Sequence, residues 1–430
     1  MAGFIELLKE NPNYRYTWMG QVVSEIGDHF NNIAVFGLAV QHADSGLVVT
    51  GVLLSRAVPA ILAGPLAGVL LDRMDRKRIM IISDLTRAVV ALGFITTIHS
   101  MNSKALYLLS ALLMLASPFF TSGRSSILPA IATREQLHTA NSLTQTTQWT
   151  TLTIGTMLGG ASVSQLGYQW AFFINALSFL FSAWSISRLR VPGGAFRAQR
   201  KALTENEVVR PWHEYAEGLR YMRRNPLLLG IAVLGLGWAS GGGAAQILFS
   251  LFGENVFHRG AAGIGTIWSF AGVGLLIGGF IAHRFGPRLS FVGYKRTVAF
   301  CFLVHGGAYI VFSQMKQFAM ALVFIALSRC AIAISSVMNF SQLLRHVADE
   351  YRGRVFSTYE TLTWGMMMLS MTAAGAASQF YSPRTIGAWS GAISSLTAVY
   401  WLALDSYGRL PEPAREGIEP EEVEVHEPTV

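Results

Sequence analysis

Apolar stretches of about twenty residues recur along almost the whole chain, and this feature limits its possible folds more than any other. A helix needs about 20 consecutive apolar residues to cross a bilayer, and within lipid only helices and closed barrels satisfy every backbone polar group. Charged residues make up 13% of the 430 residues and hydrophobic residues 52%, whereas a soluble domain carries about 25% charged residues. The sequence therefore predicts an all-α membrane protein.

Twelve such stretches are present, and their spacing predicts two halves of six helices each. The polar stretch at 188–226 separates the sixth span from the seventh, so we expect it to be a linker. One half is expected at 1–187 and the other at 227–405. The tail at 406–430 is acidic and low in aromatic residues, a composition typical of disorder. The expected spans are residues 17–41, 46–71, 79–99, 105–128, 140–163, 168–187, 227–251, 262–282, 294–314, 318–341, 355–380 and 384–405.

The distribution of basic residues predicts the orientation of these spans. Of the 33 Lys and Arg residues, 26 lie in the terminal segments or in every second connection and the span ends that border it, four lie in the other connections and three lie deep within spans. Because positive charge is retained on the cytoplasmic side of membrane proteins, both termini and the linker are expected to be cytoplasmic. We expect a multi-pass protein of a bacterial inner (plasma) membrane. Nucleic acid is excluded as a partner, because the basic residues lie between spans and not on one face of a soluble domain.

A weak internal repeat supports two related halves. GVLLDRMDRK at 68–77 aligns without gaps with GFIAHRFGPR at 279–288, and each segment follows the second span of its half. Two parallel six-helix repeats are a known transporter architecture. The matching topological positions therefore favour a pseudo-symmetric transporter fold.

The first of these segments resembles the loop signature of the major facilitator superfamily, Gly-x-x-x-Asp-Arg-x-Gly-Arg-Lys. The matching residues are Gly68, Asp72, Arg73, Arg76 and Lys77. Asp75 stands where the superfamily usually has Gly. The segments SEIGDHF (24–30), ISDLTRA (82–88), SSILPAIATREQLHTANSL (125–143) and RGRVFSTYETL (352–362) resemble the branch that contains macrolide-efflux proteins and the enterobactin exporter. The resemblance covers almost the full chain. It implies the twelve-helix fold of that superfamily and proton-coupled export of lipophilic or amphipathic small molecules, such as drugs, macrolides or siderophore-like compounds.

The resemblance also implies a role for the charged connection after the second span. In the family this aspartate latches the halves together while the cytoplasmic side is closed, so Asp72 would meet the start of the eleventh span near Arg354. A helix N-terminus stabilises a carboxylate through its dipole, which agrees with such a contact. We interpret Asp84, Arg87 and Arg124 as members of the same network. The alternative is that the charged run only anchors the connection on its side of the membrane.

The first span carries the polar groups that best suit proton coupling. Four of them share one helix face: Gln21, Glu25, Asp28 and Asn32. Ionisable residues inside a membrane are costly and mark functional sites by default, and low-dielectric surroundings disfavour a charged carboxylate in general. We therefore predict that Asp28 exchanges the coupling proton or contacts substrate, with Glu25 as the second candidate. A permanent ion pair between Asp28 and Arg56 in the second span is the alternative.

Other polar and adaptable side chains are expected to line a central cavity. Arg329 lies within the tenth span without an acid in that span, so it either partners an acid of the first span or holds an anionic group of the substrate. The further candidates are Asn141, Gln145, Gln148, Trp238, Gln246, Met367 and Met371. Methionines suit varied ligands, but a methionine run is equally typical of core packing. Few polar groups together favour a large amphipathic substrate.

Glycine-rich segments predict close helix contacts and bending. GTMLGG at 155–160 resembles the Gly-Pro-x-x-Gly-Gly element of drug–proton antiporters, with Thr156 in place of Pro. Gly155 and Gly159 have the spacing that lets helices approach closely, for gating or for ordinary packing. Three consecutive glycines at 241–243 favour bending in the seventh span.

Other functional classes are less well supported. The chain has no phosphate-binding loop, no metal-protease motif and no nucleophile elbow, so we expect neither an ATP-driven pump nor an enzyme, and no cofactor. An importer or facilitator of the same fold, acting on lysophospholipid or a nutrient, remains the alternative function. A non-transporting scaffold that recruits a partner through the acidic tail is the third. The expected partners are a small-molecule substrate, protons and lipid, and the expected state is a monomer.

Overall fold

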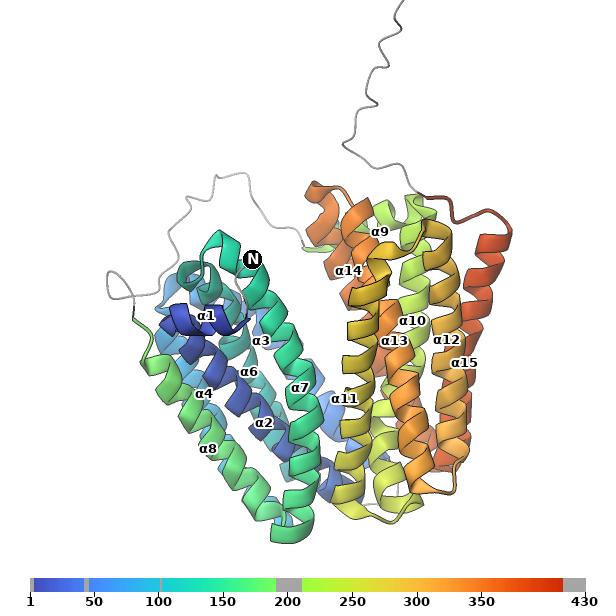
Figure 1. Ribbon diagram of the computed structural model, residues 1–430. Helices are drawn as coiled ribbons and strands as arrows, with labels where there is room; N and C mark the ends of the chain where they lie inside the picture. Colours follow the sequence, from blue (N-terminus) through green and yellow to red (C-terminus); the bar gives the residue numbers. More distant parts are fainter. Residues whose placement is uncertain (1–3, 42–45, 101–102, 191–210, 413–430) are drawn as a thin grey trace, which may run out of the picture.

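The computed structural model describes residues 4–41, 46–100, 103–190 and 211–412, and within these ranges all regular structure is helical. Most of the predicted linker (191–210) and the end of the predicted tail (413–430) lie outside the described residues. Figure 1 shows two helix bundles that lean against each other. The first bundle contains α1 (Phe4–Glu10), α2 (Pro12–Gln41), α3 (Leu47–Arg73), α4 (Arg76–Gly93), α5 (Thr97–Ser100), α6 (Ser103–Ile131), α7 (Arg134–Leu166) and α8 (Tyr168–Ser187). The second contains α9 (Pro211–Arg224), α10 (Pro226–Leu251), α11 (Gly260–Phe285), α12 (Phe291–Gln314), α13 (Phe318–His346), α14 (Asp349–Ala377) and α15 (Pro383–Ser406).

The all-helical membrane fold predicted from the sequence is confirmed. Within the described ranges, twelve α-helices have between 18 and 33 residues, and each coincides with one predicted span. At 1.5 Å per residue, all but the shortest reach at least about 30 Å, the thickness of the hydrocarbon core. The shortest, α4, is continued by the 3₁₀ turn Phe94–Thr96 and by α5.

Eight of these helices are apolar enough along 18 residues to be recognised as spans by length and composition alone. The other four are α2, α7, α14 and α15. The first three carry polar rows that a lipid-facing helix would not tolerate. Their polar faces must therefore face protein or a water-filled space.

Local sequence explains where several helices begin. Thr133 and Gln136 form a reciprocal capping box at the start of α7. Asn225 accepts hydrogen bonds from the backbone at the start of α10, which has a proline in its first turn. Ser382 caps α15 in the same way, and its first residue is also proline. These caps lie just outside the apolar windows, so the helices are longer than hydropathy alone indicates.

The bundles share a core at one end and are separate at the other. We call the end that carries α1, the α3–α4 connection and the end of α15 the terminal face, at the top of Figure 1, and the other end the opposite face. One continuous apolar cluster joins Phe30–Val40 of α2 to residues of α10, α11 and α14 near the opposite face. Toward the terminal face, the apolar clusters belong to one bundle or the other. The described chain is thus closed at the opposite face and spread apart at the terminal face.

The contact between the bundles is built on very close backbone approach. A Cβ atom on Gly265 of α11 would lie 2.3 Å from the carbonyl oxygen of Thr156 on α7, so only glycine fits there. Gly160 of α7 packs on the backbone of Ala261 in the same way. A separate contact joins α3 to the end of α14, where the backbone N–H of Gly46 donates to Ser378 Oγ at 2.7 Å. The α7–α11 contact is therefore a tight seam between the bundles.

Candidate functional site

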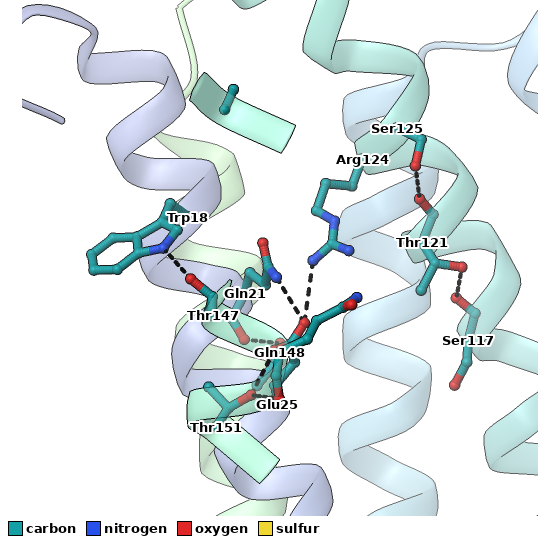
Figure 2. Close-up of polar contacts among 12 residues, drawn as sticks. Trp18, Gln21, Glu25, Ser117, Thr121, Arg124, Ser125, Thr147, Gln148 and Thr151 are labelled. Carbon is teal, nitrogen blue, oxygen red and sulfur yellow. Dashed lines mark hydrogen bonds and ion pairs between the residues drawn. The ribbon is translucent and has the colours of Figure 1, made fainter. Parts of the chain in front are cut away.

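Glu25 on α2 lies at the centre of a polar cluster inside the first bundle (Figure 2). Its carboxylate accepts hydrogen bonds from Gln21 Nε2 at 2.8 Å and from Thr151 Oγ1 at 2.8 Å. Arg124 Nη1 of α6 lies 3.5 Å from Glu25 Oε1. The side chains of Arg124 and Glu25 are 15% and 21% exposed, so the pair borders solvent-accessible space. Three helices thus converge on one carboxylate.

The sequence of α7 explains how it reaches this cluster. Thr147 and Thr151 are four residues apart and point toward α2 from one face of α7. Trp18 Nε1 donates to Thr147 Oγ1 at 2.8 Å, one turn from the Thr151 contact (Figure 2). On the terminal side of the cluster, a pocket of about 240 Å³ is lined by Gln21, Arg124, Asn141 and neighbouring polar side chains. The carboxylate can therefore be approached from the terminal face.

The structure separates Asp28 from the partner that the sequence offered as an alternative. Among the described contacts, Asp28 makes no hydrogen bond and no ion pair, although Arg87, Glu25 and Arg56 lie within electrostatic range. Arg56 Nη1 instead donates to Asn32 Oδ1 at 2.6 Å, and its guanidinium lies 5.5 Å from the centre of the Phe36 ring. In this conformation Asp28 is therefore not locked in an ion pair with Arg56.

Asp84 and Arg87 form an ion pair within α4, and both side chains are buried. The guanidinium of Arg87 lies 4.6 Å from the ring centre of Phe120 and 4.3 Å from that of Phe179. These contacts hold the pair inside the first bundle, between α4, α6 and α8. The structure thus does not bring Asp84 and Arg87 together with Arg124, which pairs with Glu25 instead.

Three exposed polar residues follow one stripe of α7: Asn141, Gln145 and Gln148. The adjacent face on one side, with Gly155 and Gly159, packs on His29 and Phe30 of α2. The adjacent face on the other side, with Gly160, packs on α11. The stripe therefore faces the space between the two bundles. The close approach predicted for Gly155 and Gly159 is thus made to α2, while Gly160 lies at the seam.

Arg329 lies near the middle of α13, inside the second bundle, and its guanidinium is 5.2 Å from the ring centre of Phe249. It does not pair with an acid of α2. Trp238 and Gln246 are half-buried on α10, and Trp238 Nε1 is buried without a hydrogen-bond partner in the described residues.

Two other expectations for the second bundle meet a different outcome. Met367 and Met371 are each 5% exposed and belong to the shared apolar core, so they act as packing residues in this conformation. The three glycines at 241–243 leave α10 unbroken. Gly241 receives the backbone of α15 and Gly243 that of α14. The irregular turn comes later, as the π-helix Phe252–Val256.

The charged connection between α3 and α4 is held by its own bundle. Arg76 Nη1 donates to the carbonyl oxygen of Ser126 at 2.7 Å. Lys77 Nζ donates to the carbonyl oxygens of Ser187 and Leu189 at 2.7 and 2.9 Å. Basic groups near the last carbonyls of a helix are favourable, so these contacts tie the connection to the ends of α6 and α8.

The remaining candidate residues of the α3–α4 connection differ in their contacts and exposure. Asp75 caps α4 by accepting from the Lys77 backbone N–H at 3.0 Å. Gly68 and Arg73 are exposed. The side chain of Asp72 lies outside the described part of the structure, so the predicted latch stays a prediction. Its expected counterpart, Arg354 at the start of α14, pairs with Glu217 of α9 at 3.0 Å.

Sequence reasoning missed Thr147, Thr151 and Glu217. The two threonines continue the four-residue spacing of the predicted Gly155 and Gly159 along α7, and that row of small and polar residues was the available signal for a helix face that packs against α2. Glu217 had no such signal, because its partner lies more than a hundred residues away in the sequence.

Comparisons with known proteins agree on one family of membrane transporters. A family model described as Major Facilitator Superfamily matches residues 17–370. The uncharacterized MFS-type transporter YfiS of Bacillus subtilis (strain 168) is 28% identical over 83% of this chain and 84% of its own length. The enterobactin exporter EntS of Citrobacter koseri is 27% identical over 82% of each chain. Among solved structures, the nucleoside transporter NupG superimposes with a TM-score of 0.67 at 12% identity, covering 91% of this chain and 99% of that one.

Proposed function

Since the chain belongs to the major facilitator superfamily, we propose that it is a secondary exporter that moves an amphipathic small molecule across a bacterial inner membrane in exchange for protons. It acts as a monomer, by alternating access of the two bundles. The observation that carries this proposal is the pair of carboxyls on α2, Glu25 and Asp28, inside the first bundle and near its arginines.

The orientation follows from charge. The terminal face carries the basic α3–α4 connection, with Arg73, Arg76, Lys77 and Arg78, and the basic end of α9. Under the positive-inside rule this face is cytoplasmic. The bundles, which spread apart at this face (Figure 1), then represent the state that is open to the cytoplasm and closed to the outside.

The coupling step assigns different roles to the two carboxyls. Glu25 is held by Gln21, Thr151 and Arg124, so its negative charge has partners. Asp28 has no such partners within the described residues, and it is the group that exchanges a proton. Substrate that enters from the cytoplasm displaces this proton, and the bundles rock about the α7–α11 seam. On the outside, substrate leaves and Asp28 takes up a new proton.

The wall of the cavity supports an amphipathic substrate. Asn141, Gln145 and Gln148 offer side-chain amides from one stripe of α7, whereas the rest of the described interior is mainly apolar. Export is favoured over import by the similarity to EntS, which is named as an enterobactin exporter.

The test measures substrate-driven proton movement in inverted membrane vesicles with a quenched pH dye. The compounds are a macrolide, a lipophilic cation, a catecholate siderophore and a lysophospholipid. Wild type is compared with Asp28→Asn, Glu25→Gln and Asp405→Asn. Asp405 is the matched control, because it forms an ion pair with Lys295 outside the cavity and the two side chains are 24% and 12% exposed, similar to Glu25 and Arg124.

The expected result is proton release with at least one compound, abolished by Asp28→Asn and retained by Asp405→Asn. Transport of a compound without any proton signal would refute antiport. Transport in the inward direction would favour the importer. If Asp28→Asn still shows substrate-driven proton release, Glu25 becomes the candidate for proton exchange. Glu25→Gln must then abolish the release.

A further inference from the structure

Arg329 is a half-buried cation of α13 without a protein acceptor among the described contacts. Its guanidinium offers five N–H donors. Within the described residues it makes no hydrogen bond and no ion pair, and it lies 5.2 Å from the centre of the Phe249 ring. An aromatic ring attracts a cation but does not replace an oxygen acceptor for the N–H groups. These donors therefore lack an acceptor from the described part of the chain.

Two buried arginines of the first bundle have both an aromatic contact and an oxygen acceptor. Arg87 lies between two aromatic rings and also pairs with Asp84. Arg56 lies against Phe36 and also donates to Asn32. Each of these arginines thus combines a ring contact with an oxygen acceptor. Arg329 has the ring contact and lacks the acceptor, so the missing component is an oxygen or another anion.

A small cavity lies directly at Arg329. Its walls come from α10, α12, α13 and α15, and the lining includes Gly242, His305, Tyr309 and Ser394. The volume is about 10 Å³, which is room for one water-sized species. Tyr309 Oη is buried and has no hydrogen-bond partner in the described residues. Arg329 and the orphan hydroxyl of Tyr309 therefore line one cavity with room for one water-sized species.

The charges nearby do not compensate Arg329. Asp405 is paired with Lys295 near the terminal face. Glu360 is exposed on α14, and Glu254 lies in the π-helix at the opposite end of α10. An unpaired charge in the interior is costly, and an acceptor from outside the chain would remove that cost.

We propose that the cavity between Arg329 and Tyr309 binds one small monovalent anion, either a halide ion or the carboxylate end of a bound substrate. Arg329 supplies the charge and the N–H donors, and the Tyr309 hydroxyl donates a further hydrogen bond. Binding of a free halide is independent of the proposed transport. Where the substrate supplies the carboxylate, the site rests on the proposed function and assigns an acidic group to the exported molecule.

The experiment measures the thermal unfolding midpoint of the purified full-length protein by tryptophan fluorescence. Sodium gluconate is replaced stepwise by sodium chloride or sodium formate at constant ionic strength. The variants are Arg329→Gln, Arg329→Lys, Tyr309→Phe and Arg345→Gln. Arg345 is the matched control, because it is an exposed arginine at the end of the same helix.

We expect chloride and formate to raise the wild-type midpoint by several degrees along a saturating curve. Arg329→Gln abolishes this response, Tyr309→Phe weakens it several-fold, and Arg345→Gln retains it. Equal midpoints in all salts for wild type would overturn the proposal, as would a full response in Arg329→Gln or its loss in Arg345→Gln. If Arg329→Gln does not fold, the wild-type and Tyr309→Phe series decide.

A competition arm distinguishes the two sources of the anion. The probes are an amphipathic carboxylate, added to the panel for this purpose, and the lipophilic cation, which carries no acidic group. If the substrate supplies the anion, the carboxylate shifts the chloride curve to higher concentrations and the cation leaves it unchanged. If a free halide is the ligand, neither compound shifts the curve. Both readouts use purified protein without a proton gradient, so failure of antiport and failure of the anion site remain distinguishable.

Discussion

The ion pair between Glu25 and Arg124 should contribute a measurable coupling energy. At 3.5 Å, two unit charges attract by about 5 kcal/mol at an effective dielectric constant of about 20 and by about 1 kcal/mol in water. The side chains are 21% and 15% exposed, so the pair lies between these limits, and desolvation offsets part of the gain. We expect a coupling of about 2 kcal/mol, above the range of exposed pairs, about 0.2–1 kcal/mol.

A double-mutant cycle isolates this quantity. The free energy of unfolding is measured in detergent for wild type, Glu25→Gln, Arg124→Gln and the double variant. Gln21 and Thr151 donate to different oxygens of Glu25, so glutamine keeps one of these two contacts. The loss of the other is common to both Glu25→Gln variants and cancels in the cycle, which therefore reports mainly the charge. Glu25→Gln combined with Arg345→Gln is the control, and distant pairs are additive within about 0.5 kcal/mol. A coupling below about 0.5 kcal/mol for Glu25 and Arg124 would refute the pairing, and Arg124 would then be free to bind substrate alone.

Two further predictions concern the equilibrium between conformations, measured as distances between spin labels at the terminal ends of α4 and α13. Gly265→Ala forces α7 and α11 apart at the seam, at a cost of about 1–3 kcal/mol, and should shorten the label distance by favouring the state closed at the terminal face. Gly307→Ala is the control, because a Cβ at Gly307 meets nothing within 4 Å, and it should leave the label distance unchanged. An equal change of the distance in Gly265→Ala and Gly307→Ala would contradict the proposed role of the seam. Glu217→Gln removes the contact that holds Arg354 in this conformation and should also shorten the distance, while the free energy of unfolding changes by less than about 1 kcal/mol. A longer distance in Glu217→Gln would show that Glu217 does not oppose closure.

The fold was predictable because the membrane imposes one dominant constraint. The recurrence of long, largely apolar stretches located all twelve long helices, including the four that apolar length and composition alone do not identify, and the errors lie at the polar ends of the helices. Span 140–163 is observed as Arg134–Leu166, since the capping box at Thr133 and Gln136 extends the helix beyond the apolar window. The start of α14, Asp349 instead of 355, likewise lies in a polar segment that precedes the apolar window. A hydropathy window does not detect such polar helix ends, although the residues that form them can be read from the sequence.

The site was predictable only along single helices. Periodicity correctly placed Gln21 and Glu25 one turn apart, and the structure joins them by a hydrogen bond. It could not show that Arg124, 99 residues further along, reaches the same carboxylate, because contacts between helices depend on rotation and tilt. For the same reason, composition could not decide that Met367 belongs to the core.

The distribution of buried charge suggests how a substrate would lie between the bundles. In the first bundle, the carboxyls of Glu25, Asp28 and Asp84 balance three arginines, so protonation of Asp28 leaves that cluster with one net positive charge. Antiport requires proton and substrate to exclude each other, and a positive cluster repels a cationic group and attracts an anionic one. An acidic group next to α2 would therefore be attracted by the protonated state, which favours co-transport. On the proposed mechanism, an acidic group of the substrate belongs at Arg329, in the second bundle, and a basic group belongs at α2.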